Sequence, residues 1–249
     1  CYQIGAEKIG WERRNKKPGE GSGKIRRGLG MASQIWWGAG RPGTLADLKL
    51  HPDGSVEAVC GTQDLGTGTK TYMAVVAAET LGLDLQDITV KIGNTEYPWS
   101  GSSGGSTTTP SVAPAIRDAA LKALDYLKKL ATEKLKVNSE EIIIENKKLF
   151  NKNNPAQSVD FQALIREQRR ELVFHGECGG RSSDYAYNTF GAHFAEVEVD
   201  IETGKIKVVK VVAVHDSGRI MNKLTAESQV IGGITQGLST ALFEERVID

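Results

Sequence analysis

The 249-residue sequence lacks the features that mark nucleic-acid binding or a membrane span. Its 31 lysine and arginine residues are balanced by 31 aspartate and glutamate residues, so the formal net charge is zero. A neutral chain argues against a nucleic acid or an anionic membrane as the main partner. No run of residues approaches the roughly 18 apolar positions of a transmembrane helix. Neither class of partner is therefore expected.

Cysteine is also sparse, and its spacing argues against several kinds of site. Cys1, Cys60 and Cys178 are scattered and form no Cys-x-x-Cys pattern. This odd-numbered set disfavours a disulfide framework, a zinc site or an iron–sulfur site built from this chain alone. The first five residues are no signal peptide and lack an initiator methionine. We therefore expect the numbering to begin inside a longer protein, and both a cytoplasmic and a periplasmic location stay open.

A glycine-rich loop stands between a strand-like and a helix-like segment. From Gly61 to Thr69 it reads Gly-Thr-Gln-Asp-Leu-Gly-Thr-Gly-Thr, and its glycines let the backbone turn sharply and approach a ligand. The helix expected over 69–81 would point bare N–H groups and its positive dipole end into the loop. Such a corner suits an anion such as phosphate. The loop matches neither common nucleotide fingerprint, so a plain structural turn is an equal alternative.

The same order of elements occurs twice along the chain. Each copy has a hairpin, a polar loop and a helix. The expected strands and helix are 45–50, 55–60 and 69–81 in the first copy, and 194–200, 205–214 and 224–244 in the second. The turn glycines of the two hairpins, Gly54 and Gly204, are 150 residues apart. We therefore expect two related half-units that face each other, with their loops converging on one ligand.

Between the copies, the pattern predicts a Ser/Thr-rich loop over 100–111 and a long amphipathic helix over 112–134. A strand–turn–strand over 141–150 and a short helix over 160–169, capped by Asp160, are expected to follow. The whole chain is thus expected to have an α+β architecture with mixed sheets.

Five motifs in one order carry a family resemblance. They read Gly-Thr-Gln-Asp-Leu-Gly-Thr-Gly at 61–68, Gly-Gly-Ser-Thr-Thr-Thr-Pro-Ser-Val at 104–112, Gly-Ala-His-Phe-Ala-Glu-Val-Glu-Val at 191–199, His-Asp-Ser-Gly-Arg-Ile-Met-Asn at 215–222, and Gly-Gly-Ile-Thr-Gln-Gly-Leu at 232–238. Together they resemble the molybdopterin-binding large subunit of the xanthine oxidase family, and the first motif is most similar to bacterial aldehyde oxidoreductases. The resemblance extends over essentially the whole chain.

The resemblance implies a fold and a division of the chain. The fold would be the molybdenum-hydroxylase cofactor-binding domain, an α+β fold with two related hairpin–loop–helix subdomains and mixed sheets. Residues 1–43 would be an irregular lead-in with one strand, 44–150 the first cofactor-binding subdomain, and 151–249 a second subdomain truncated at its C-terminal end.

The resemblance also implies a cofactor and the residues that contact it. The family holds molybdenum through the dithiolene of a pterin, in many bacterial members extended to a cytosine dinucleotide, so no metal ligand is expected from this chain. The implied cofactor-binding residues are Gly61, Gln63, Gly66, Thr67, Gly68, Thr69, Thr109, Pro110, Ser111 and Gln236. Thr67 stands where many members carry glutamine, and its hydroxyl can still donate a hydrogen bond. Trp36, by an ungapped count, falls where the family places an aromatic residue along the substrate funnel.

The implied activity is hydroxylation of aldehydes or N-heterocycles with oxygen taken from water. The complete protein would be a molybdenum enzyme of the aldehyde oxidoreductase or xanthine dehydrogenase type, with iron–sulfur clusters and FAD in other domains or subunits. The family's general-base glutamate segment and its glycine-phenylalanine loop would lie outside residues 1–249, so this chain is expected to carry no catalytic residue and to be inactive alone. Loss of a general base typically costs on the order of 10²–10⁴ in rate.

Two other interpretations stay open. A non-catalytic structural or subunit-interaction domain would keep the fold without the cofactor. A generic phosphate-binding module would explain only the first loop.

Four further features carry weaker signals. Adjacent residues on a strand point to opposite faces, so His215 and Asp216 are expected to brace a loop rather than to form a relay. His175, Cys178 and His193 fit no common zinc spacing. Cys60 closes a strand and is expected to be a small core residue. Arg181 could reach an anion or form a surface ion pair.

Overall fold

The computed structural model describes residues 1–180, 182–245 and 247–248. The chain forms two compact units. One comprises Cys1–Gly38 and Tyr187–Asp249, and the other comprises Ala39–Ala186. We refer to them as the split unit and the central unit.

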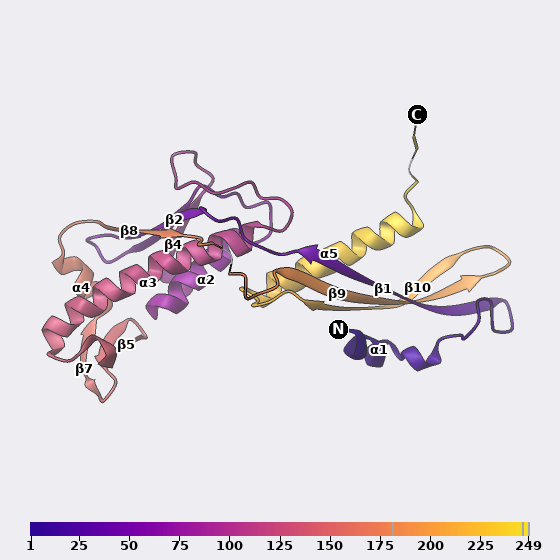
Figure 1. Ribbon diagram of the computed structural model, residues 1–249, viewed down its shortest axis with the longest axis horizontal. Helices are drawn as coiled ribbons and strands as arrows, with labels where there is room; N and C mark the ends of the chain where they lie inside the picture. The colour runs from indigo at the N-terminus through magenta and orange to yellow at the C-terminus, as the bar shows by residue number, and fades with distance from the viewer. Residues whose placement is uncertain (181, 246, 249) are drawn as a thin grey trace. The chain divides into compact units, whose positions relative to one another are not determined.

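The central unit packs helices against a mixed sheet (Figure 1). The sheet has the strand order β4-β3-β2-β8, in which β3 and β4 are parallel and the other pairs antiparallel. Its elements are β2 (Leu45–Leu50), β3 (Val56–Cys60), α2 (Thr69–Leu81), β4 (Ile88–Ile92), α3 (Thr108–Leu135) and β8 (Leu172–Glu177). The predicted first hairpin and helix are confirmed, and Gly54 has the left-handed φ of 86° that the hairpin turn requires.

Helix α3 begins earlier than predicted. The sequence pattern placed its start at residue 112, but the helix starts at Thr108. Thr109, Pro110 and Ser111 therefore lie in its first turn rather than in the preceding loop. Proline is tolerated there because the first turn needs no N–H donor from it.

Helix α3 lies directly on strand β8, with no side chains between their backbones at one point. A Cβ atom added at Gly176 of β8 would stand 2.1 Å from the carbonyl oxygen of Ala115 and 2.5 Å from the nitrogen of Ala119. Ala115, Ala119, Ala120 and Ala123 are all fully buried. Small residues on both elements thus allow a close approach that a larger side chain would prevent.

A small antiparallel sheet and a short helix complete the central unit. The elements are β5 (Ile142–Glu145), β6 (Lys148–Asn151), β7 (Asn154–Asp160) and α4 (Phe161–Glu167). The predicted N-cap is confirmed, because Asp160 Oδ1 accepts a hydrogen bond of 2.8 Å from the backbone N–H of Ala163.

The split unit is built around an antiparallel sheet that joins the two ends of the chain. Its elements are α1 (Tyr2–Ile9), β1 (Ile25–Trp37), β9 (Asn188–Asp200), β10 (Ile206–Asp216) and α5 (Lys223–Leu242), with the strand order β1-β9-β10. The predicted second hairpin and helix are confirmed. The lead-in contains one strand, β1, which pairs with β9, and also helix α1, which the sequence pattern did not predict.

Helix α1 covers one face of this sheet. Ile9 of α1 packs with Ala192 and Phe194 of β9, all of them buried. A Cβ atom added at Gly5 would lie 2.2 Å from the ring of Phe194. The ring therefore packs directly against the backbone of α1, which only a glycine at this position allows. The aromatic edge of Trp11 closes the cluster, 5.5 Å from Phe194 between ring centroids.

A buried carboxylate ties the lead-in to the same sheet. Glu196 is 5% exposed, and both of its oxygens accept hydrogen bonds from the guanidinium of Arg13, at 3.1 and 3.0 Å. This bidentate partner lowers the pKa of Glu196 against the opposing effect of burial. The pair fixes residues 11–13 next to a strand 183 positions away in the sequence.

The compact units do not coincide with the ranges 1–43, 44–150 and 151–249. Strand β9 pairs with β1, and β8 pairs with β2, so long-range pairing places the two ends of the chain in one unit and residues 151–186 in the other. A functional division of the chain into those three ranges stays a prediction.

Helix α5 is the least packed of the long helices. None of its residues is buried, and Leu224 and Ile231 are 78% and 63% exposed. Over the residues that the structure describes, no helix is both long and apolar enough to cross a membrane.

The contact between α3 and β8 predicts a strong effect of one added methyl group. Gly176→Ala should destabilise the chain by about 1–3 kcal/mol, because the methyl group overlaps backbone atoms that cannot rotate away. Urea denaturation would measure the change. Gly179→Ala is the matched control, since no atom lies within 4 Å of a Cβ atom there. Equal stabilities of the two variants would show that α3 moves freely on the sheet.

Candidate functional site

Two polar loops of the central unit are hydrogen-bonded to each other. Gln63 of the glycine loop accepts a hydrogen bond of 3.0 Å at Oε1 from the backbone N–H of Ser103. The hydroxyl of Ser103 donates in return to the carbonyl of Gln63, at 3.3 Å. The glycine loop and the Ser/Thr loop are therefore joined at this point, and that they share a ligand stays a prediction.

The N–H groups of the glycine loop are not bare, contrary to the expectation. The carboxylate of Asp64 accepts hydrogen bonds from the backbone N–H groups of Gly66 at 2.9 Å, Gly68 at 3.3 Å and Lys70 at 3.3 Å. Partial burial works against the charged carboxylate, but these donors outweigh it, and the pKa of Asp64 is lowered. An internal carboxylate thus occupies part of the anion-binding corner at the start of α2.

The sequence analysis missed this role of Asp64. An aspartate two residues before a glycine and just ahead of a helix is a known signal, because its side chain bonds to backbone N–H groups that follow it. The glycines of the motif indicated backbone N–H donors, but the acceptor of their hydrogen bonds, Asp64, belongs to the same motif.

The first turn of α3 is held close to the segment after the split unit's first strand. Ser111, 4% exposed, accepts a hydrogen bond of 2.7 Å at Oγ from the backbone N–H of Arg41 and donates one of 2.5 Å to the carbonyl of Thr107. A Cβ atom at Gly40 would stand 2.1 Å from the carbonyl oxygen of Pro110. The hydroxyl of Ser111 therefore has structural partners, whereas Thr108 and Thr109 are the half-buried threonines of this turn.

Two buried hydroxyl groups beside these loops have no hydrogen-bond partner. They are Thr62 Oγ1 and Tyr72 Oη, whose residues are 0% and 3% exposed. Burial raises the pKa of the Tyr72 phenol far above its ordinary value, and the nearby hydroxyls of Thr69 and Thr109 only partly oppose this effect. Unpartnered buried polar groups are uncommon in folded proteins and require an explanation. Both oxygens are closed off from solvent, so a ligand at the surface of the loops would not reach them directly.

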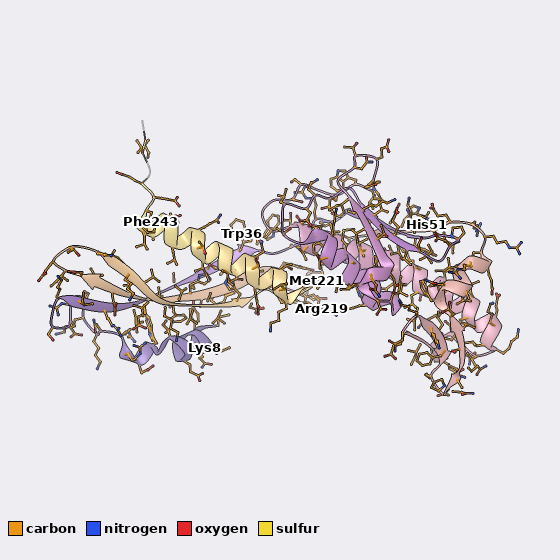
Figure 2. The ribbon with its side chains drawn as sticks, turned by 180° about the vertical axis from the view of Figure 1, so that it is seen from behind. Lys8, Trp36, His51, Arg219, Met221 and Phe243 are labelled. Carbon is orange, nitrogen blue, oxygen red and sulfur yellow. The ribbon has the colours of Figure 1, made fainter. Side chains whose placement is uncertain are left out.

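Two predicted site residues belong to the split unit. Gln236 lies on α5. Trp36 lies on β1 and is 56% exposed (Figure 2). The other predicted residues lie in the central unit, and the expected convergence of the two loop–helix corners on one ligand remains a prediction.

The histidines do not gather into a metal site. His175 Nδ1 is 2.7 Å from Asp47 Oδ1, whereas His193 and His215 face each other with their Nε2 atoms 2.8 Å apart. Along the described part of the chain, no three histidine, cysteine, aspartate or glutamate side chains are grouped to hold a metal ion. Arg181, considered above as an anion contact, lies outside the described residues.

Cys60 is a core residue, as predicted. Its side chain is fully buried and its Sγ lies 3.3 Å from the carbonyl oxygen of Leu45. Burial raises the pKa of the Cys60 thiol, which disfavours the nucleophilic thiolate.

The fold and the site define an α+β domain that gathers polar loops at the N-termini of α2 and α3. The family described as the molybdopterin cofactor-binding domain matches residues 4–249. The chain therefore belongs to this family, and the resemblance drawn from the motifs is confirmed.

Curated relatives agree with this assignment. The chain is 32% identical over 254 residues to the aldehyde oxidoreductase molybdenum-binding subunit PaoC of Escherichia coli O157:H7, covering 100% of this chain and 33% of that protein. It is 29% identical over 262 residues to the putative xanthine dehydrogenase molybdenum-binding subunit XdhA of Escherichia coli K12, covering 100% of this chain and 34% of that protein. The chain thus spans about a third of the length of these relatives.

Solved structures confirm the α+β fold. Reconstituted CO dehydrogenase from Oligotropha carboxidovorans matches with a TM-score of 0.81 and 24% identity, over 99% of this chain and 32% of that chain. Quinoline 2-oxidoreductase from Pseudomonas putida 86 matches with a TM-score of 0.79 and 23% identity, over 100% of this chain and 33% of that chain.

The hydrogen bonds of Asp64 predict a loss of stability on substitution. Asp64→Asn should cost about 0.5–2 kcal/mol, as the loss of a helix cap does. Because the folded pKa is lowered, the contribution is present above the ordinary value of 3.8 and is lost as the pH falls through the folded value. Urea denaturation at pH 7 and pH 3 would test both statements, with Asp125→Asn on α3 as the control. A variant as stable as the control would contradict them.

The histidine pair predicts an unusual titration. Burial and the neighbouring His215 both lower the pKa of His193 below its ordinary 6.5. The stability that neutral His193 contributes is therefore present above pH 6.5 and is lost as the pH falls through the folded value. His215→Ala should move the pKa of His193 upward, yet leave it below 6.5 because burial remains. NMR titration of the imidazole signals would measure this shift, and an unchanged pKa would show that the two rings do not interact.

Proposed function

We propose that this chain is the cofactor-binding part of a molybdenum enzyme that hydroxylates aldehydes or N-heterocycles with oxygen from water. The observation that carries the proposal is the hydrogen-bonded pair of loops at the start of α2 and α3. Gln63 and Thr67 are exposed there, and their amide and hydroxyl groups fit a ligand rich in hydrogen-bonding atoms, as a pterin is.

The residues divide into those that would contact the cofactor and those that shape the loops. Thr67, Thr109 and the side chain of Gln63 would offer hydroxyl and amide groups to the pterin or to its cytosine dinucleotide extension. Gly66 and Gly68 would let the backbone approach, while Asp64 holds their N–H groups in place. Pro110 and Ser111 would set the position of Thr109, and Gln236 would approach from α5.

The chain's proposed task is binding and orientation. The bound molybdenum centre would supply the two-electron oxidation and the transfer of oxygen to the substrate. Electrons would leave through iron–sulfur and FAD groups in other domains or subunits. The negative charge of Asp64 in the glycine loop favours contacts of the loop with neutral parts of the ligand over direct contact with a phosphate at those N–H groups.

A second candidate function is a structural or subunit-interaction domain without cofactor. It is favoured by the exposed apolar residues of the split unit, such as Trp37 at 56% and Phe243 at 84% exposure, the latter visible at the end of α5 (Figure 2). Large exposed apolar side chains commonly mark contacts with other protein parts. This candidate leaves the hydrogen-bonded pair of polar loops in the central unit unexplained.

Molybdenum content would distinguish the two functions. The longer polypeptide that carries this chain, purified from a host that makes the cofactor, should contain close to one molybdenum per chain. Gln63→Ala should lower this content several-fold, because it removes the bridge from Gln63 to Ser103 and one amide from the site. Gln3→Ala, on an exposed position of α1, is the matched control. A polypeptide without molybdenum under these conditions would favour the structural domain.

A further inference from the structure

Strand β1 lies at one edge of the split unit's sheet and pairs only with β9. The register of this pair is unbroken along the whole of β1, and the hydrogen bonds just beyond its two ends show which residues bond to β9. The N–H of Gly38 donates to the carbonyl of Tyr187 at 2.9 Å, and the N–H of Ile201 donates to the carbonyl of Lys24 at 3.1 Å. Hydrogen-bonded residues alternate in an antiparallel pair, so the even-numbered residues of β1 bond to β9.

The odd-numbered residues of β1 therefore direct their N–H and C=O groups away from the sheet. One contact confirms this direction, because the carbonyl of Arg27 accepts a hydrogen bond of 3.0 Å from Asn15 Nδ2. Four more residues of this kind follow along the strand: Leu29, Met31, Ser33 and Ile35. Among the described residues, none forms a hydrogen bond with the outward backbone groups of these four. We call residues 29–35 the open edge.

The open edge has none of the features that protect an edge strand from pairing. Natural edge strands carry lysine, proline or a β-bulge. From residue 28 to residue 37, β1 reads Gly-Leu-Gly-Met-Ala-Ser-Gln-Ile-Trp-Trp, with no charged residue, no proline and no shift of register. The strand at the opposite edge, β10, carries Lys207 and Lys210 and has a break of register between Val208 and Lys210. One edge of the sheet is thus protected from pairing, and the other is not.

Apolar side chains flank the open edge. Successive side chains of a strand point to opposite faces, so Leu29, Met31 and Ile35 share one face of the sheet. Leu29 packs against the buried cluster between α1 and the sheet, whereas Met31 and Ile35 are 44% and 65% exposed. A strand placed along the open edge would therefore remove apolar area from water and also satisfy the outward backbone groups.

We propose that the open edge pairs with a β-strand from a part of the longer polypeptide outside residues 1–249. This chain spans 33% and 34% of the two curated relatives described above, so a polypeptide of their kind has further segments that can supply the strand. A segment of the same polypeptide is present at a high effective concentration, which favours it over a second copy or a separate subunit. The strand that fits has apolar side chains at alternate positions, beside Met31 and Ile35. The proposal does not depend on a bound cofactor.

Hydrogen exchange of the full polypeptide tests the proposal on the unsubstituted protein. Mass spectrometry with residue resolution would compare the amides of Met31, Ser33 and Ile35 with those of Ala32 and Gln34, which bond to β9. If a strand covers the open edge, both sets should exchange on the order of 100-fold more slowly than unstructured amides. If only Ala32 and Gln34 are slow, the edge is free and the proposal fails.

Ser33→Pro tests the same pairing by substitution. Proline removes an N–H that points away from β9, so the pairing of β1 with β9 keeps all its hydrogen bonds, while an added strand loses a donor. In the full polypeptide, the amides of Met31 and Ile35 should exchange about tenfold faster, and the midpoint of thermal unfolding should fall.

Ala213→Pro on β10 is the matched control. Ala213 pairs with His193, an odd-numbered residue of β9 whose backbone groups bond to β1, so the N–H of Ala213 also points away from the sheet. This variant changes the opposite edge and should leave exchange in the open edge as it was. Equal exchange of the open edge in the two variants would contradict the proposal.

Dilution separates the three candidate partners. Protection of the open edge that persists at dilutions where light scattering shows a single polypeptide supports a strand from the same chain. Protection that disappears together with a dimer identifies a second copy, and protection that requires another subunit identifies that subunit. Either of these two results overturns the proposed partner. No outcome depends on molybdenum content, so the proposed function stands or fails separately.

Discussion

The candidate site depends on direct backbone contact at the N-terminal half of α3. At Gly40 and at Gly176, the backbone of another segment lies directly against α3. A Cβ atom added at either glycine would be 2.1 Å from a carbonyl oxygen of the helix, that of Pro110 or that of Ala115. No side chain separates the helix from the segment at residue 40 or from β8, so α3 has little freedom to slide or rotate. The hydrogen bond from the N–H of Arg41 to Ser111 Oγ fixes the same turn. Thr109 is therefore held in place by its neighbours before any ligand arrives, which is the condition for precise binding.

The second constraint is the use of an internal carboxylate to shape the glycine loop. Glycines allow the turn, but two N–H groups of the loop and that of Lys70 in α2 would need water or a ligand if Asp64 did not accept from them. The loop is thus rigid without a bound anion. What remains available for recognition is a set of hydroxyl and amide side chains around the starts of two helices, and this favours a neutral, heteroatom-rich ligand surface.

The order of the elements could be predicted from local patterns, and long-range pairing could not. Alternation and turn glycines located β2, β3 and α2 with nearly the observed bounds, because hairpins and amphipathic helices depend on neighbours in the sequence. Strand β1, rich in glycine and with no clear alternation, becomes a strand because it pairs with β9. The start of α3 was placed four residues late, because Thr108–Ser111 continue the Ser/Thr-rich composition of the preceding loop.

The sequence by itself determined the family and the α+β class. Both follow from several motifs that occur in one order, and such motifs can be recognised in the sequence without knowing the fold. Tertiary structure alone decided which polar groups are already satisfied, since a hydrogen-bond partner is a matter of position in space. In the folded chain, Ser111 is hydrogen-bonded to Arg41 and Thr107. The N–H group of Gly66 in the glycine loop donates to Asp64. The buried hydroxyls of Thr62 and Tyr72 have no hydrogen-bond partner. Burial is the physical reason for the difference, because a polar group's need for a partner arises only when packing removes it from water.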